Sequence, residues 1–131
     1  MKSHPKIGTT GELEFVVEHQ HCIDFSTDGM PAVLSTPHLI GLLERTARHA
    51  LSPFLETDER SVGIEIELRH LAPTPLGQQI TLRARVIHTE GTQVSFQIEA
   101  RDGHELIARG NHKRAVIRVA SFARRVARKA D

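Results

Sequence analysis

The stretch Ser35-Thr36-Pro37-His38-Leu39-Ile40-Gly41-Leu42-Leu43-Glu44 begins the clearest helical pattern in the chain. Thr36 followed by Pro37 is a helix start signal, because a threonine hydroxyl can cap a free N–H group and the fixed φ of proline suits the first helical position. Pro53 ends the pattern, so we expect one helix of about 17 residues. Its apolar side chains share one broad arc of the helical wheel, and they are Leu39, Ile40, Leu42, Leu43, Ala47, Ala50 and Leu51.

Strand patterns lie on both sides of this helix. Residues 12–23 suggest a first strand and residues 24–34 a loop. After the helix the apolar period changes to two, which predicts an inward-facing row of Val62, Ile64, Ile66, Leu68 and His70. Further alternating strands follow over 80–86, 94–100 and 106–119, joined by tight turns. The order predicts an α+β fold, with an antiparallel sheet around one central helix.

Length and composition favour one small domain with a basic end. The 131 residues are enough for a single core, so we expect one domain over residues 1–131. Residues 113–131 hold seven of the 17 Lys and Arg residues and one of the 16 acidic residues. The region from about 120 to 131 is therefore a basic, helix-compatible tail, which leaves an anionic partner open.

Several partner classes are disfavoured. With no Trp, no Tyr and five Phe, the chain has few aromatic rings to stack on bases, so we expect no nucleic-acid partner. We find no apolar run of membrane-spanning length and no signal-peptide pattern, so we expect a cytoplasmic protein with no membrane partner. Cys22 is the only cysteine, and His19 and His21 have no third ligand at a suitable spacing, so no metal site is expected.

Three residues are candidates for chemistry, and each also has an ordinary structural explanation. Glu44 borders the apolar arc, where partial desolvation suits a base or nucleophile, but it could equally be a surface carboxylate paired with Arg48. His70 ends an inward row and could shuttle protons, or be a histidine at the rim of the core. Thr36 could bind or attack a carbonyl group, or only cap the helix.

Taken together, Thr36, Glu44, His70 and Arg114 resemble the pattern of hot-dog-fold thioesterases, and the nearest resemblance is to the fluoroacetyl-CoA thioesterase type. The similarity runs from the first strand to the basic tail. It is carried by STPHLIGLLE at 35–44, the Gly63 region, RHLAPTPLG at 69–77, EGTQVSFQIEARDG at 90–103 and GNHKRAVI at 110–117.

The resemblance implies a hot-dog fold, a homodimer with active sites at the interface, and hydrolysis of an acyl-CoA thioester with a small acyl group. It implies catalytic roles for Thr36, Glu44 and His70, a backbone contact to the acyl group at Gly63, and a supporting or CoA-side role for Arg114. Coenzyme A enters as part of the substrate, and no separate cofactor is implied.

One position departs from the fluoroacetyl type, which gates its pocket with phenylalanines in the loop before the helix. Here that loop reads STDGMPAVLS, at 26–35, with Met30 in the gate position and Phe25 as the nearest aromatic residue. Methionine can line an acyl pocket without forming a rigid lid, so we expect an acyl contact at Met30 without selectivity for fluoroacetyl.

Three other functions remain open at this point. The first is a hot-dog module that binds acyl-CoA or an acyl carrier without turnover. The second is a hydratase or dehydratase, for which we find no Asp and His at the required spacing. The third is a nucleic-acid adaptor that uses the basic tail.

Overall fold

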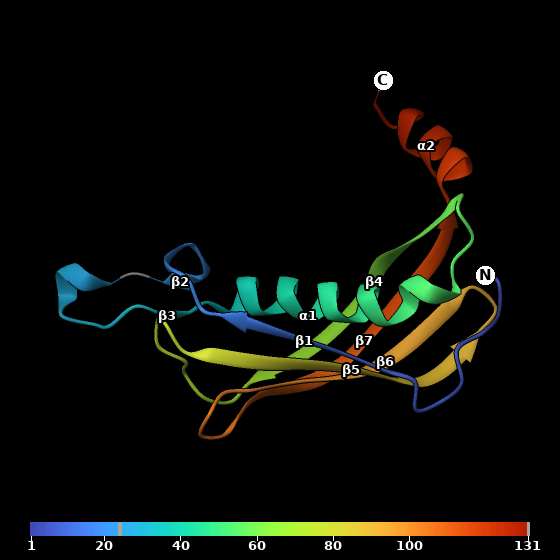
Figure 1. Cartoon of the computed structure of the whole chain (residues 1–131). Helices are drawn as coiled ribbons and strands as arrows, with labels where there is room; N and C mark the ends of the chain where they lie inside the picture. The colour runs from blue at the N-terminus through green and yellow to red at the C-terminus, as the bar shows by residue number, and fades with distance from the viewer. Residues whose placement is uncertain (24, 131) are drawn as a thin grey trace.

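The computed structural model describes residues 1–23 and 25–130 and shows a curved antiparallel sheet with one long helix against its concave face (Figure 1). The sheet order is β1-β5-β6-β7-β4, which makes β1 and β4 the edge strands. The strands are β1 (Thr10–Val16), β4 (Glu59–His70), β5 (Gln79–Glu90), β6 (Gln93–Arg101) and β7 (Leu106–Arg118). The expected α+β architecture is therefore confirmed.

The long helix α1 (Thr36–Leu51) buries the predicted apolar arc against the sheet. Six of the seven predicted residues are buried, Ile40 is half-buried, and Thr46 is buried as well. The N-cap is Ser35, whose hydroxyl accepts a hydrogen bond from the His38 N–H at 3.4 Å, so the expectation that Thr36 caps the helix is wrong. Because Ser35 performs the capping, the Thr36 hydroxyl can bond elsewhere.

The segment before α1 is less regular than expected. The single strand expected over 12–23 is wrong, because β1 ends at Val16 and the 3₁₀ helix η1 (His19–His21) follows. The Glu18 N–H bonds to His21 Nδ1 at 3.1 Å, and such local side-chain bonds replace those of a strand ladder. Of the loop expected over 24–34, Asp24 lies outside the described residues. The remaining short elements are β2 (Cys22–Ile23), η2 (Ser26–Asp28), β3 (Val33–Leu34) and η3 (Ser52–Phe54).

A β-bulge in β4 changes which side chains face α1. The pairing with β7 shifts between Gly63 and Glu65, so odd-numbered residues face inward before the shift and even-numbered residues after it. Ser61 is therefore buried, whereas Ile64 is 47% exposed. The expectation of one unbroken inward row from Val62 to His70 is wrong in its first half. The bulge lets both Gly63 and His70 face the helix, although the difference of seven between their positions would place them on opposite faces of a regular strand.

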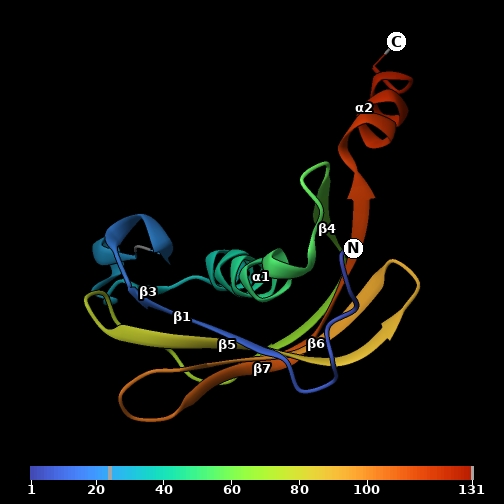
Figure 2. The same ribbon diagram turned by 45° about the vertical axis from the view of Figure 1, so that its right-hand side comes forward.

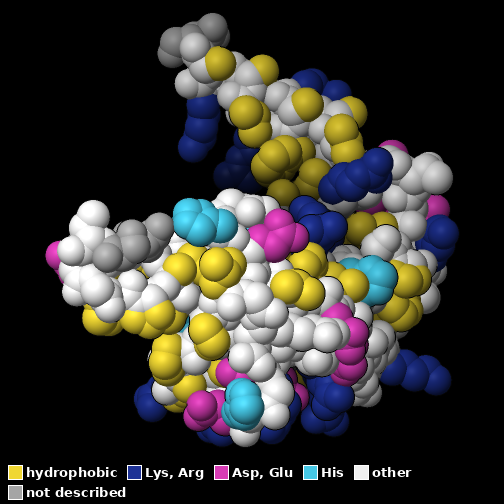
Figure 3. All heavy atoms as spheres, turned by 60° about the vertical axis from the view of Figure 1, so that its left-hand side comes forward, with side chains coloured by type: hydrophobic (Ala, Val, Ile, Leu, Met, Phe, Trp, Pro, Cys, Tyr) yellow, Lys and Arg dark blue, Asp and Glu magenta, His cyan; other side chains and the backbone are white. Residues whose placement is uncertain are grey.

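The chain continues from β7 into a second helix, α2 (Val119–Ala127), which stands away from the sheet (Figure 2). None of its residues is buried, and hydrophobic side chains gather along it in Figure 3, among them Val119, Phe122 and Val126. The helix starts at Val119, one residue before the basic tail expected at about 120–131, and Asp131 lies outside the described residues. Across residues 1–23 and 25–130, no helix is long and apolar enough to cross a membrane.

Candidate active site

Thr36 and His70 form a hydrogen-bonded pair at the start of α1. Thr36 lies in the first turn of the helix and His70 is the last residue of β4, and Thr36 Oγ1 is 2.8 Å from His70 Nδ1. Burial lowers the pKa of His70 below its ordinary value of 6.5, which favours the neutral ring near neutral pH. His70 Nε2 is buried and has no hydrogen-bond partner among the described residues. A neutral imidazole in this position can accept or pass on a proton.

An open apolar depression lies beside this pair. It has a volume of about 320 Å³, and Thr36 and His70 are the polar residues in its lining. The other lining residues are Ile23, Val33, Leu34, Leu71, Ala72 and Pro73. An apolar lining with two convergent polar side chains is typical of a site that holds a small organic group by its apolar part and orients its polar part.

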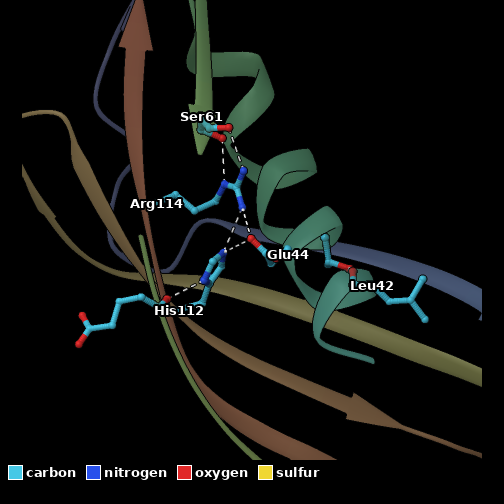
Figure 4. A network of polar contacts seen from close by, with 7 residues as sticks. Leu42, Glu44, Ser61, His112 and Arg114 are labelled. Carbon is cyan, nitrogen blue, oxygen red and sulfur yellow. Dashed lines mark hydrogen bonds and ion pairs between the residues drawn. The ribbon is translucent and has the colours of Figure 1, made fainter. Parts of the chain in front are cut away.

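Glu44 lies in a second polar cluster, farther along α1 (Figure 4). Its Oε2 is 3.3 Å from Nη1 of Arg114, which comes from β7. The Glu44 side chain is 41% exposed and that of Arg114 is 5% exposed, so a buried cation holds one side of a carboxylate that solvent still reaches. The pairing with Arg48 that the sequence left open is not the contact found here, since Arg114 is the ion-pair partner.

The Arg114 guanidinium is fixed by β4. Its Nε donates to Ser61 Oγ and its Nη2 donates to the Ser61 carbonyl oxygen, each at 2.9 Å. Burial lowers the pKa of Arg114 and the Glu44 charge opposes this, but an arginine remains charged in both cases. Because its donors are used inside the cluster, Arg114 is placed as a support for Glu44.

His112 belongs to the same cluster, although no sequence argument above selected it. Its Nδ1 is 2.9 Å from the Glu65 carbonyl oxygen, and its Nε2 is 3.1 Å from Arg114 Nη1. Burial lowers the pKa of His112 below 6.5. A signal was present in the sequence, because His112, Arg114 and Val116 alternate along one face of the last strand.

Gly63 lies directly beside the Glu44 carboxylate. A Cβ atom added at this position would collide with Glu44 Oε2 and lie 3.1 Å from Cε1 of His112. The absence of a side chain therefore leaves room for the carboxylate next to β4. Met30, in contrast, is 55% exposed, and neither it nor Phe25 is among the residues that line the depression beside Thr36.

Five of the six predicted site residues thus lie in two separate clusters within one chain, Thr36 with His70 and Glu44 with Arg114 and Gly63. Thr36 and Glu44 are eight residues apart on α1, a rise of about 12 Å along the helix axis. Among the described residues, Glu44 makes no hydrogen bond or ion pair with His70. Within residues 1–23 and 25–130, no cluster of His, Cys, Asp and Glu side chains could hold a metal ion.

Comparisons with known proteins give a consistent result. Residues 17–120 match the family model described as fluoroacetyl-CoA-specific thioesterase. The chain is 37% identical over 99 residues to a fluoroacetyl-CoA thioesterase of Streptantibioticus cattleyicolor, an alignment that covers 76% of this chain and 71% of the relative.

Solved structures agree with this match. A mutant of the fluoroacetyl-CoA-specific thioesterase FlK superposes with a TM-score of 0.89 at 31% identity, covering 98% of this chain and 99% of that chain. A FlK mutant in complex with fluoroacetate and CoA superposes with a TM-score of 0.83 at 31% identity, covering 90% and 99%. A hypothetical protein of Thermus thermophilus, described as a thioesterase superfamily member, has a TM-score of 0.89 at 28% identity, covering 99% and 96%.

Proposed function

The chain belongs to the fluoroacetyl-CoA-specific thioesterase family, and from this premise we propose that it hydrolyses the thioester of a small acyl-CoA to the free acid and coenzyme A. The observation that carries the proposal is the 2.8 Å contact between Thr36 Oγ1 and His70 Nδ1 at an apolar depression. A thioester carbonyl next to this pair meets a hydroxyl, an imidazole and the free N–H groups of the first helical turn. These are the groups that acyl transfer needs.

The catalytic roles follow from what each side chain can do. Thr36 binds or attacks the thioester carbonyl, and His70 takes up and returns the proton that moves to the leaving thiolate. Glu44 is the base for water or the covalent nucleophile. The two candidate nucleophiles differ in the residue that carries the acyl group in a trapped intermediate, which intact-protein and peptide mass spectrometry would identify.

We propose that a homodimer completes the site, with Thr36 and His70 from one protomer and Glu44 and Arg114 from its partner. This proposal is supported by the rise of about 12 Å between Thr36 and Glu44 along α1, which is too long for one carbonyl group to contact both. It is also supported by β4, an edge strand on which Ile64 is 47% exposed. An edge strand has backbone N–H and C=O groups that can pair with a strand of a second copy.

The acyl group is small and is selected by the depression beside Thr36. We propose that fluoroacetyl selectivity is absent, because His70 is the only aromatic ring in the lining and Phe25 lies outside it. Met30 remains a proposed acyl contact, on the basis of its position in the loop before the helix. Gly63 is proposed as a backbone contact to the acyl group, supported by its place beside Glu44.

The coenzyme A part of the substrate carries several phosphates. The basic side chains of α2 and the residues after it, among them Arg124, Arg125, Arg128 and Lys129, are exposed and favour the approach of such an anion. No separate cofactor is part of the proposal. We place the protein in the cytoplasm, in keeping with its single cysteine and a coenzyme A substrate.

The test is release of free thiol from a panel of acyl-CoAs, from short to long and including aryl and halogenated acyl groups. Wild type should release thiol and Glu44→Gln should not. Glu90→Gln is the matched control, because the Glu90 side chain is 84% exposed and outside the site. Tight binding in calorimetry without thiol release from any member would overturn hydrolysis and favour a binding module.

A further inference from the structure

The His112 ring is buried beside Glu44 and Arg114 and contacts residues of three strands. Its side chain is 1% exposed, and the ring stacks on Phe96 of β6 at 6.5 Å between ring centroids. Nδ1 faces the Glu65 carbonyl oxygen of β4 at 2.9 Å, and Nε2 faces Arg114 Nη1 at 3.1 Å (Figure 4). Each ring nitrogen therefore faces a group that can act in only one way, a carbonyl acceptor at Nδ1 and a guanidinium donor at Nε2.

These two partners determine the protonation state of the ring. A carbonyl oxygen only accepts hydrogen bonds, so Nδ1 must carry a proton. A guanidinium only donates, so Nε2 must be an unprotonated acceptor. Only the neutral, Nδ1-protonated tautomer satisfies both contacts. A charged ring would turn an N–H group toward the N–H group of Arg114.

Arg114 depends on that acceptor for its position. Two of its three nitrogens are used by Ser61, and the third, Nη1, is shared between His112 Nε2 at 3.1 Å and Glu44 Oε2 at 3.3 Å. His112 Nε2 is itself 4.0 Å from Glu44 Oε2, beyond hydrogen-bond distance. As a neutral ring, His112 therefore has no direct hydrogen bond to Glu44 and is linked to it through the guanidinium.

We propose that His112 is a positioning residue: as a neutral acceptor it directs Arg114 Nη1 toward Glu44 and thereby sets the orientation of the reacting carboxylate. The inference rests on the proposed thioesterase function, in which Glu44 is base or nucleophile. A carboxylate placed about 1 Å from its productive position loses roughly 100-fold in rate, so the effect belongs in kcat more than in KM.

The first experiment measures kcat and KM for wild type, His112→Leu, His112→Gln, Arg114→Met and the double variant His112→Leu/Arg114→Met. Thermal unfolding is measured on each variant to confirm that it folds. We expect His112→Leu to lower kcat by about 100-fold with KM little changed. His112→Gln keeps one donor and one acceptor and should recover most of this loss. His104→Leu, an exposed histidine in the turn before β7, is the control that should match wild type.

The double variant separates positioning from structural support. If His112 acts through Arg114, the double variant should have the same kcat as Arg114→Met alone, because both substitutions remove the same interaction with Glu44. Independent roles would multiply the two losses. A folded His112→Leu protein with wild-type kcat, or multiplied losses in the double variant, would overturn the proposal while thiol release by wild type still supports the function.

A second experiment needs no substrate. Long-range nitrogen–proton NMR on the histidine rings of the full chain reports the tautomer directly. We expect His112 to be neutral with the proton on Nδ1 at pH 7. In Arg114→Met, Nδ1 should keep its proton for the Glu65 carbonyl oxygen, while Nε2 becomes free to take up a second proton beside Glu44. A ring that is charged or protonated on Nε2 in the wild-type protein would overturn the proposal, including in the case where no acyl-CoA is hydrolysed.

Discussion

Thr36 and His70 are 34 residues apart in sequence, yet the threonine hydroxyl lies 2.8 Å from Nδ1 of the histidine. The contact joins the first turn of α1 to the last residue of β4. It depends on Ser35, because a threonine used as the helix cap would direct its hydroxyl to a backbone N–H group. Ser35 therefore caps the helix, and the hydroxyl of the adjacent Thr36 is left to contact His70.

These separate roles predict opposite results for substitutions at the two positions. Thr36→Val should lower kcat/KM by at least about 100-fold, since it removes the group bonded to His70, and leave the unfolding free energy within about 0.5 kcal/mol of wild type. Ser35→Ala should lower the unfolding free energy by about 1 kcal/mol and keep most activity. Steady-state kinetics and urea unfolding on both variants are the measurements. Activity retained in Thr36→Val would exclude the threonine from the reaction.

The shared site of the proposed dimer predicts complementation between inactive variants. Thr36→Val and Glu44→Gln should each be inactive alone. When the two chains are co-expressed, each mixed dimer holds one site with both substitutions and one site with neither. Random assembly makes about half of the dimers mixed, so the unpurified mixture should recover about a quarter of wild-type activity and the purified mixed dimers about half. Thiol release from tandem-purified mixed dimers tests this, and no recovery would place all catalytic residues of a site in one chain.

The space beside Gly63 predicts a loss of activity that exceeds any loss of stability. In Gly63→Ala the new Cβ must displace the Glu44 carboxylate, which lies at the end of a flexible side chain. We expect kcat to fall by about 10-fold or more, with an unfolding free energy lowered by about 1 kcal/mol or less. Gly103→Ala is the control, because its Cβ would make only ordinary contact, 3.5 Å from Gln78 Nε2. Equal kinetics in the two variants would contradict the prediction.

The buried histidines predict how stability changes with pH. The pKa values of His70 and His112 are lowered from 6.5 by burial. Above pH 6.5 both histidines are neutral in the folded and the unfolded chain, so their burial costs no deprotonation and the unfolding free energy is at its full value. As the pH falls below 6.5 the unfolded chain binds protons that the folded protein does not, so the unfolding free energy falls by up to about 1.4 kcal/mol per pH unit for each histidine.

Urea unfolding between pH 7.5 and 5, at intervals of half a unit, checks this slope. The slope should decrease in His112→Gln and again when His70→Gln is added, since each change removes one group that titrates. Glu44, Arg114 and Glu65 face His112 in the folded protein and are the same in every variant of the series. An unchanged slope in both variants would assign the pH dependence to other groups.

Much of the fold could be predicted from the sequence because its patterns are regular. The arc of α1 and the alternation along β5, β6 and β7 each report burial on one face, and that burial is observed. The first strand is shorter than its sequence pattern predicts, because the polar residues 18–21 form their own local hydrogen bonds. The sequence pattern does not distinguish Ser35 from Thr36 as the helix cap, because the two residues carry the same chemistry one position apart.

The candidate site could be predicted only in part. Thr36 contacts His70 and Arg114 contacts Glu44, while the catalytic roles that the resemblance implies for Thr36, Glu44 and His70 stay predictions. Ser61 and His112 were missed, because their roles follow from contacts between β4 and β7 that no local pattern contains. The bulge at Gly63 was also missed, and it is the reason that an apparently continuous row from Val62 to His70 divides into two faces.

The β4 bulge has a consequence for how the chain can tolerate insertions and deletions. Removing one residue between Gly63 and Ile66 would restore a regular pleat and turn either Gly63 or His70 to the outer face of the sheet. The hydrophobic content of the strand would barely change, yet one of the two clusters of proposed site residues would lose a member. Related chains that lack this extra residue should therefore fold in the same way without the chemistry proposed here.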